Sequence, residues 1–450
     1  MRFSIKLFKM NCETLLILDF GVPTTQLIAR RVRQSHVYCR ILPGSTPIEK
    51  IRAIHPKGLI LADAREDFLS ENLSTWEKEL LDLNIPILAV GMSQKFFTVP
   101  TDSLVFCEVP ATSAALKTEI GKFVGKCGCL CDWTMKSFAE NTISRLQEQI
   151  GQERVICGLS GGVDSAVVAA LLSRAVGTQL TCIFVDTGLM RKSERKSVQK
   201  EFTGHFQTDL RIVDAESVYL EKLAGIVEPQ LKRKTIGHLF IDIFSEEAAK
   251  IQGAKFLAQG TVYPDILESG GTSETPASTI KLHHNVGGLP DDLEFDLVEP
   301  LRELFKDEVR ELGMQLGLPE EMVWRHPFPG PGLAVRCLGE VTKERLNILR
   351  EADAIVVEEI KNAGLYRDVS QAFAVLLPVQ SVGVSNNERT YENAVVVRCV
   401  VTEDFVHADW ARLPYHVLES ISNRVIREVA GVNRVAYDIS SKPPATIEWE

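Results

Sequence analysis

The sequence predicts an α/β protein of three domains, two doubly wound α/β units followed by an α+β unit. A single hydrophobic core is unusual for a chain of 450 residues, so length alone favours about three domains. Short apolar runs alternate with segments of helical spacing through most of the chain, which is typical of parallel sheets covered by helices. A Pro/Gly tract at 327–332 interrupts this alternation and marks the start of the last unit.

The first unit, residues 1–124, contains three short apolar runs that predict buried parallel strands at 14–20, 58–62 and 85–90. Segments with helical spacing, 24–34 and 70–83, lie between these strands. From 91 to 125 the pattern favours neither helix nor strand.

The second unit, residues 125–325, repeats the alternation more clearly. Its predicted helices are 134–150 and 163–175, and its predicted strands are 154–159, 180–185, 210–214 and 255–259. The third unit, residues 326–450, mixes long helices with strands in an α+β pattern. Its predicted elements are the helices 343–363 and 414–429 and the strands 394–401 and 434–439.

Composition and charge exclude several classes of protein. The net charge of -10 argues against nucleic acid bound along the whole surface, although small basic pockets for anionic ligands remain possible. No run approaches about 18 uncharged apolar residues, and the N-terminus lacks a signal-peptide pattern, so we expect neither membrane insertion nor export. A cytoplasmic enzyme is the expected class.

The ten cysteines lie mostly in apolar runs, as in reduced intracellular proteins. Cys127, Cys129 and Cys131 form the one cluster, and their two-residue spacing predicts one face of a packed strand. A metal site is the weaker alternative, because no second cysteine pair lies near.

The segment with the most chemical information is the hexapeptide Ser160-Gly161-Gly162-Val163-Asp164-Ser165, which follows an apolar strand and opens a helix. Its glycines allow a tight turn that presents N–H groups to an anion, and the helix N-terminus adds positive potential. Asp164 suits a polyanion only when a cation such as Mg²⁺ accompanies it. The segment is neither a Walker A loop nor a dinucleotide fingerprint. A plain turn capped by serine and aspartate is the alternative.

The hexapeptide resembles the PP-loop of ATP pyrophosphatases, which cleave ATP between the α and β phosphates. From Cys127 to Glu450 the chain resembles the GMP synthetase family. The matching segments are 155–170, CIFVDTGL at 182–189, QGT at 259–261, KLHHNVGG at 281–288, LFKDEVR at 304–310, FPGPGL at 328–333 and KPPATIEWE at 442–450. The resemblance implies an adenine-nucleotide-alpha-hydrolase-like ATP pyrophosphatase domain and a C-terminal α+β dimerisation domain, hence a homodimer.

The resemblance also implies a reaction, in which the xanthine O2 of XMP attacks the α-phosphate of ATP and ammonia then displaces AMP to give GMP. Mg²⁺ is the expected metal, with Asp164 as its ligand, and Lys306 and Asp164 are the expected catalytic residues. The implied ATP-binding residues are Ser160, Gly161, Gly162, Val163, Asp164, Ser165 and Val185. The implied XMP-binding residues are Arg233, Gln371, Lys442 and Glu448. The family also places the His283-His284 pair in a lid near the site.

The N-terminal unit resembles a class I glutamine amidotransferase domain, which is flavodoxin-like and uses a Cys–His–Glu triad, through LDFG at 18–21 and TQLIARRVR at 25–33. The nucleophile elbow falls at 87–94, where no cysteine is present and the segment is shortened. Ser93 would lack a base, and no histidine lies between His55 and His205. The domain is therefore predicted to be truncated and inactive, with ammonia taken free or from a separate glutaminase.

Two other hypotheses remain open at this stage. Another PP-loop enzyme, acting in tRNA thiolation or NAD synthesis, would lack the C-terminal tract 442–450. A decayed nucleotide-binding protein is the non-enzymatic alternative, although the intact loop, Lys306 and tail argue against it. One departure from the family lies at Asn386-Asn387, where a Gly-Asp pair is common, so a contact there is in doubt.

Overall fold

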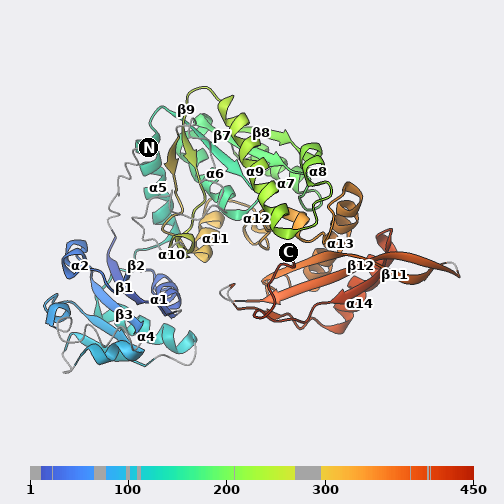
Figure 1. Ribbon diagram of the computed structural model, residues 1–450. Helices are drawn as coiled ribbons and strands as arrows, with labels where there is room; N and C mark the ends of the chain where they lie inside the picture. Colours follow the sequence, from blue (N-terminus) through green and yellow to red (C-terminus); the bar gives the residue numbers. More distant parts are fainter. Residues whose placement is uncertain are drawn as a thin grey trace.

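The computed structural model describes residues 12–22, 24–64, 78–97, 102–108, 113–206, 208–268, 295–385, 387–402, 405 and 407–450. Three sheets follow one another along the chain, and each has its own covering helices (Figure 1). The α/β fold class predicted from the alternation of apolar runs is confirmed. The tract 281–288, with His283 and His284, and most of the predicted helix 70–83 lie outside the described residues.

The first sheet is fully parallel and has the strand order β2-β1-β3-β4-β5, which is the flavodoxin-like order. Its strands are β1 (Thr14–Phe20), β2 (Tyr38–Pro43), β3 (Gly58–Ala64), β4 (Ile87–Val90) and β5 (Leu104–Cys107). The described helices of this unit are α1 (Thr24–Arg33), α2 (Ile48–Ile54) and α4 (Ser113–Lys126), with the 3-10 helix η1 (Gly91–Phe96). The stretch 91–125, whose sequence favours neither helix nor strand, contains β5 and nearly all of α4. The four residues of β5 are too few to show the alternation typical of a strand.

The cysteine cluster is a turn, so the predicted strand is wrong. Cys127 follows the end of α4, and the chain then passes through left-handed backbone at Gly128 (φ 62°) and Cys131 (φ 54°). Extended alternation cannot continue through such residues. Among the described residues, no group of three or more His, Cys, Asp or Glu side chains is arranged to hold a metal ion.

The second sheet is also parallel, in the order β10-β9-β6-β7-β8. Its strands are β6 (Arg154–Leu159), β7 (Leu180–Asp186), β8 (Asp209–Asp214), β9 (Ala254–Ala258) and β10 (Asp296–Val298). The helices are α5 (Met135–Ile150), α6 (Val163–Val176), α7 (Glu194–His205), α8 (Glu216–Leu223), α9 (Pro229–Ala249), α10 (Tyr263–Glu268), α11 (Lys306–Gln315) and α12 (Glu320–Val323), with η2 (Gly177–Gln179). The strand order reverses between β6 and β9, and ligands bind at such switch points.

The third sheet is built on the long antiparallel pair β11 (Gln371–Ser385) and β12 (Glu388–Val401). The short β13 (Asp409–Trp410) and the parallel β14 (Val432–Tyr437) complete it, with α13 (Lys343–Asn362), α14 (Tyr415–Glu428) and η5 (Gly332–Val335). One buried cluster contains Val185 of β7 together with Ala372 of β11 and Leu349 of α13. The second and third units therefore share a core. None of the helices in the described residues is long and apolar enough to span a bilayer.

Candidate active site

The glycine-rich loop lies at the carboxyl end of β6, beside the switch point. Gly161 has a φ of 76°, and a Cβ there would lie 2.6 Å from Glu194 Oε1, so the turn requires glycine. Gly162 is the N-cap of α6, and the Ser160 hydroxyl accepts a hydrogen bond from the Gly162 N–H at 3.3 Å. The Ser165 hydroxyl accepts from the Ser160 N–H at 3.2 Å. These bonds fix a concave backbone at a helix N-terminus, which suits a phosphate chain.

Two charged side chains meet at this loop. Asp164 lies in the first turn of α6, and Lys306 is the first residue of α11, 142 positions later in the chain. The Lys306 ammonium donates to both carboxylate oxygens of Asp164. Both side chains remain open to solvent, at 37% and 29% exposure. Gly260, which follows β9, packs closely against Asp164, because a Cβ on Gly260 would lie 3.1 Å from the Asp164 Cβ, closer than ordinary van der Waals contact. The fold thus brings together the two residues predicted to be catalytic.

A second ion pair supports the loop from the side. Arg325 donates to the Gly161 carbonyl at 2.9 Å and pairs with Glu194 at 2.5 Å. Glu194 is the first residue of α7, and its other carboxylate oxygen accepts from the Arg191 N–H at 3.1 Å. Its side chain is only 2% exposed, so the contact is shielded from solvent screening.

Two of the four predicted XMP residues also come together. Gln371 begins β11, and its side-chain amide donates to Glu448 Oε1 at 2.9 Å and to the Pro327 carbonyl at 3.3 Å. Arg336 donates to both oxygens of Glu448, at 3.0 and 2.8 Å. The Arg336 guanidinium is fully buried and lies 3.9 Å from the centroid of the Phe373 ring. Glu448 is therefore held in one orientation by a planar, two-pronged donor.

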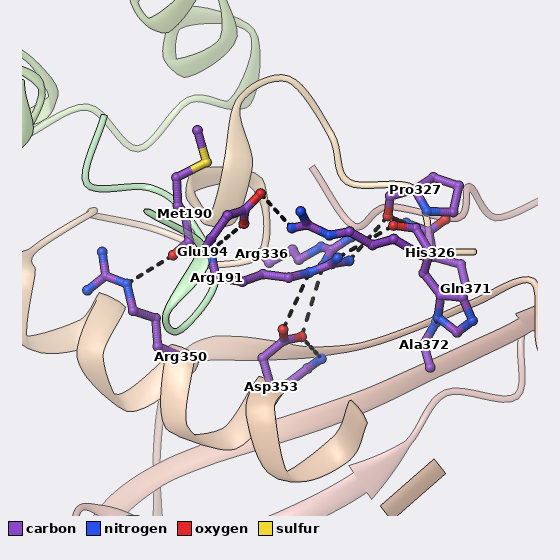
Figure 2. Close-up of polar contacts among 12 residues, drawn as sticks. Met190, Arg191, Glu194, His326, Pro327, Arg336, Arg350, Asp353, Gln371 and Ala372 are labelled. Carbon is purple, nitrogen blue, oxygen red and sulfur yellow. Dashed lines mark hydrogen bonds and ion pairs between the residues drawn. The ribbon is translucent and has the colours of Figure 1, made fainter. Parts of the chain in front are cut away.

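Arg336 belongs to a buried network that joins the second and third units. Figure 2 shows Arg191, from the loop after β7, and Arg336 both pointing toward Asp353 of α13. Their nitrogen–oxygen distances to Asp353 are 3.8 and 4.0 Å. The pKa of Arg191 is lowered to about 10, chiefly by burial; Asp353 opposes this change, and the positive charges of Arg336 and Arg325 contribute to it. One buried carboxylate thus faces the fully buried guanidinium of Arg336 and the partly buried guanidinium of Arg191.

The other two predicted XMP residues lie apart from this pair. Arg233 of α9 donates to the Glu450 main-chain oxygen, and the neighbouring Lys232 pairs with the Glu450 side chain at 2.5 Å. Lys442 donates to the Phe405 carbonyl at 2.7 Å. Arg233 is thus linked to the same C-terminal tail as Glu448, whereas the Lys442 ammonium is directed to a different loop. Val185 is buried in β7, so its side chain belongs to the core.

Sequence reasoning did not find Arg336, Asp353 or Arg191. Two of them carried a signal. Arg336 follows the apolar run Gly332–Val335, and Asp353 occupies the buried face of α13 with Leu346, Leu349, Val356 and Ile360. A charge inside an apolar stripe requires a partner, because burying it alone is very costly.

The predicted glutaminase elbow is closed in the structure. Ser93 lies in η1 directly after β4, is fully buried, and donates to the carbonyls of Leu61 and Val90 at 3.1 and 2.7 Å. Asp63 accepts from the Met92 N–H at 2.7 Å. Cys107, on the neighbouring strand, is buried, and burial raises the pKa of its thiol. Neither side chain is presented as an activated nucleophile.

A parallel sheet with SGGVDS at its switch point defines the class of ATP pyrophosphatases. The family model described as GMP synthase C terminal domain matches residues 358–449, and the one described as NAD synthase matches 136–232. The glutamine-hydrolysing GMP synthase of Carboxydothermus hydrogenoformans is 47% identical, over 97% of this chain and 99% of its own length. That of Fusobacterium nucleatum is 45% identical with the same coverage. The chain belongs to the glutamine-hydrolysing GMP synthase family.

The alignment with the Carboxydothermus protein spans 507 positions, so the relative contains segments that this 450-residue chain lacks. Among solved structures, the NH3-dependent NAD synthetase of Campylobacter jejuni is 19% identical, with a TM-score of 0.32 over 42% of this chain and 76% of its own.

Proposed function

We propose that this chain is a GMP synthase that aminates XMP to GMP and converts ATP to AMP and pyrophosphate. The observation that carries the proposal is the meeting of Asp164 and Lys306 at the glycine loop, in a chain of this family. The xanthine O2 attacks the α-phosphorus of ATP, and the bond to the bridging oxygen breaks to release pyrophosphate. Ammonia then attacks C2 of the adenylated base, and AMP leaves.

The glycine loop binds the β and γ phosphates, where negative charge accumulates as pyrophosphate leaves. The N–H groups of Gly161 and Val163 and the Ser160 hydroxyl are assigned as donors for it. The Gly162 N–H and the Ser165 hydroxyl join them once they exchange their contacts within the loop for phosphate. Lys306, which pairs with Asp164 at the loop, is assigned to the phosphates once it releases that carboxylate. Asp164 would then hold Mg²⁺, which needs only one or two carboxylates besides substrate phosphates and which supplies charge neutralisation when bound.

XMP is assigned to the surface around Glu448, Gln371 and Arg233. A carboxylate oriented by Arg336 is a suitable acceptor for purine N–H groups, and Gln371 adds a donor beside it. Arg233 and Lys442 supply positive charge for the 5′-phosphate once the tail contacts of Arg233 are exchanged for substrate.

Ammonia comes from solution or from a separate glutaminase. The support for this is the closed elbow, where Ser93 donates into the backbone and Cys107 stays a buried thiol. We also propose a cytoplasmic location, because all ten cysteines are free, as expected in a reducing compartment.

The chain is further proposed to be a homodimer, formed through the arm of β11 and β12 that reaches out from the third unit (Figure 1). Val382 and Tyr391 are cross-strand partners, and Val384 lies on the same face of the arm. All three are exposed, at 52%, 62% and 77%. An apolar face of this kind on a projecting hairpin suits a second copy. Val384→Glu should give monomers by light scattering, while Val218→Glu on α8 should not; a monomeric wild type would refute the dimer.

The activity is tested with the purified chain, XMP, ATP, Mg²⁺ and an ammonium salt at alkaline pH, by following AMP and GMP. Lys306→Ala should reduce product formation to a small residual rate, and Lys196→Ala, an exposed lysine of α7, is the matched control. Absence of AMP from the wild-type reaction would favour a decayed nucleotide-binding protein.

A further inference from the structure

A buried guanidinium, that of Arg33, lies at the contact between the N-terminal unit and the second unit. Arg33 is the last residue of α1, its side chain is 2% exposed, and it donates to both oxygens of Glu308 in α11, at 3.1 and 3.2 Å. Its remaining arm donates to the Cys39 carbonyl at 2.9 Å. The rings of Tyr38 and Trp133 lie 4.4 and 4.6 Å from its guanidinium carbon. Arg33 thus occupies an aromatic box between the two units.

Glu308 in turn fixes the start of α11. Its Oε2 accepts from the Phe305 N–H at 2.8 Å, which closes the first turn of the helix, and its Oε1 accepts from the Trp133 indole at 2.6 Å. Burial is the largest single influence on the pKa of Arg33 and lowers it, but Glu308, Cys39 and Tyr38 together raise the pKa by more. Arg33 is therefore charged at any physiological pH, and the Glu308 carboxylate is oriented by donors from both units.

Lys306 lies between Phe305 and Glu308, the two residues whose hydrogen bond closes the first turn of α11. It is the first residue of α11, directly after Phe305 and two residues before Glu308. A rotation of this turn would move the Lys306 ammonium away from the glycine loop, because the backbone that carries it is the backbone that Glu308 caps.

Two further contacts hold the units in register. The Tyr263 hydroxyl accepts from the Ile41 N–H at 2.7 Å, and the Tyr38 hydroxyl donates to Glu303 at 3.0 Å. Tyr263 also packs edge-on against Phe305, with ring centroids 5.3 Å apart. The N-terminal unit thus contacts the segment 303–308 at Glu303 and Glu308, and Lys306 of the same segment contacts Asp164 of the glycine loop.

We propose that Arg33 is a positioning residue for adenylation, acting through Glu308 on the turn that carries Lys306. This gives the N-terminal unit a role in the synthetase reaction that is independent of making ammonia. The proposal rests on the proposed function, since it assigns Lys306 to the adenylation step.

The test measures pyrophosphate release by the full chain at saturating XMP, ATP and ammonium. Arg33→Met should lower kcat by about 10- to 100-fold, the cost of a small misplacement of a catalytic group. KM for XMP should not change, because Glu448 and Arg336 are not touched. Arg33→Lys keeps the charge but has a single nitrogen, so it cannot donate to Glu308 with one arm and to the Cys39 carbonyl with another, and it should recover only part of kcat. If Arg33→Met fails to fold, the kcat of Arg33→Lys tests the positioning role of Arg33 by itself. Arg52→Met, an exposed arginine of α2, is the matched control.

A double-mutant cycle separates positioning from general stability. In a Lys306→Ala background, Arg33→Met or Arg33→Lys should have no further effect on the residual rate, because the group that it positions is absent. An equal loss of kcat in both backgrounds would overturn the proposal, as would an unchanged kcat in a folded Arg33→Lys variant. Failure of the proposed function looks different, since the wild-type chain would then release no pyrophosphate.

Discussion

Arg336→Lys is the substitution that most directly probes how Glu448 is held. Arg336 is fully buried and contacts Glu448 through two hydrogen bonds of 3.0 and 2.8 Å. Lysine keeps the positive charge opposite Asp353, so the buried network is not left with an unpaired carboxylate. It cannot reproduce the planar fork, however, and it does not stack on Phe373 in the same way.

The expected magnitude follows from these contacts. A hydrogen bond to a charged group contributes about 1.5–3 kcal/mol, and lysine can keep one of the two. A loss of about 2 kcal/mol in the positioning of Glu448 corresponds to about a 30-fold rise in KM for XMP. ATP is assigned to the glycine loop in our proposal, so the KM for ATP should stay within about twofold.

The assay is steady-state GMP formation with XMP and ATP varied separately, and with ammonium saturating. Arg427→Lys, at a 74% exposed position of α14, is the control for a generic arginine-to-lysine change. Thermal unfolding of both variants checks that the fold is retained. An unchanged KM for XMP in a folded Arg336→Lys variant would refute the assignment of Glu448 to XMP.

Asp164→Asn should lower kcat by about 100-fold and raise the Mg²⁺ concentration needed for half-maximal rate, because the carboxylate is the proposed metal ligand; an unchanged Mg²⁺ titration would contradict this. His326 has its pKa lowered to about 4, chiefly by burial. Its ring stacks on Tyr366, its Nδ1 accepts from the Ala372 N–H, and the positive charges of Arg191 and Arg310 also oppose its protonation. As the pH falls, the unfolded chain, in which the histidine pKa is near 6.5, is protonated at His326 before the folded chain is. The free energy of unfolding that His326 contributes above pH 6.5 is therefore lost as the pH falls toward 4. Between pH 7 and pH 5 the wild type should lose about 2 kcal/mol more than His326→Gln in urea unfolding, and equal losses would contradict the assignment.

The periodicity of the sequence predicted the two parallel sheets because buried strands such as β1 and β6 are continuous apolar runs. It did not predict β5 or α4, where four apolar residues and a weakly amphipathic helix leave no clear period. The three-cysteine turn after α4 was mistaken for a strand, because alternation does not reveal a left-handed residue such as Cys131.

The candidate site was predicted unevenly for a physical reason. SGGVDS is contiguous in sequence, so its geometry could be inferred from local rules alone. Lys306 and Glu448 came only from the resemblance to a family. Arg33, Arg336 and Asp353 depend on contacts between residues that are far apart in the sequence, such as Arg33 and Glu308, which are 275 positions apart. A charge within an apolar stripe indicates that a partner exists, but residue spacing does not indicate which distant residue that partner is.

The central claim is that a working synthetase is joined to an N-terminal unit that makes no ammonia. The most direct measurement compares GMP formation by the purified chain with glutamine and, separately, with an ammonium salt, at equal XMP, ATP and Mg²⁺. The account predicts GMP and AMP with ammonium and neither with glutamine. Glutamine-supported GMP formation by the chain alone, or no GMP from either nitrogen source, would contradict it.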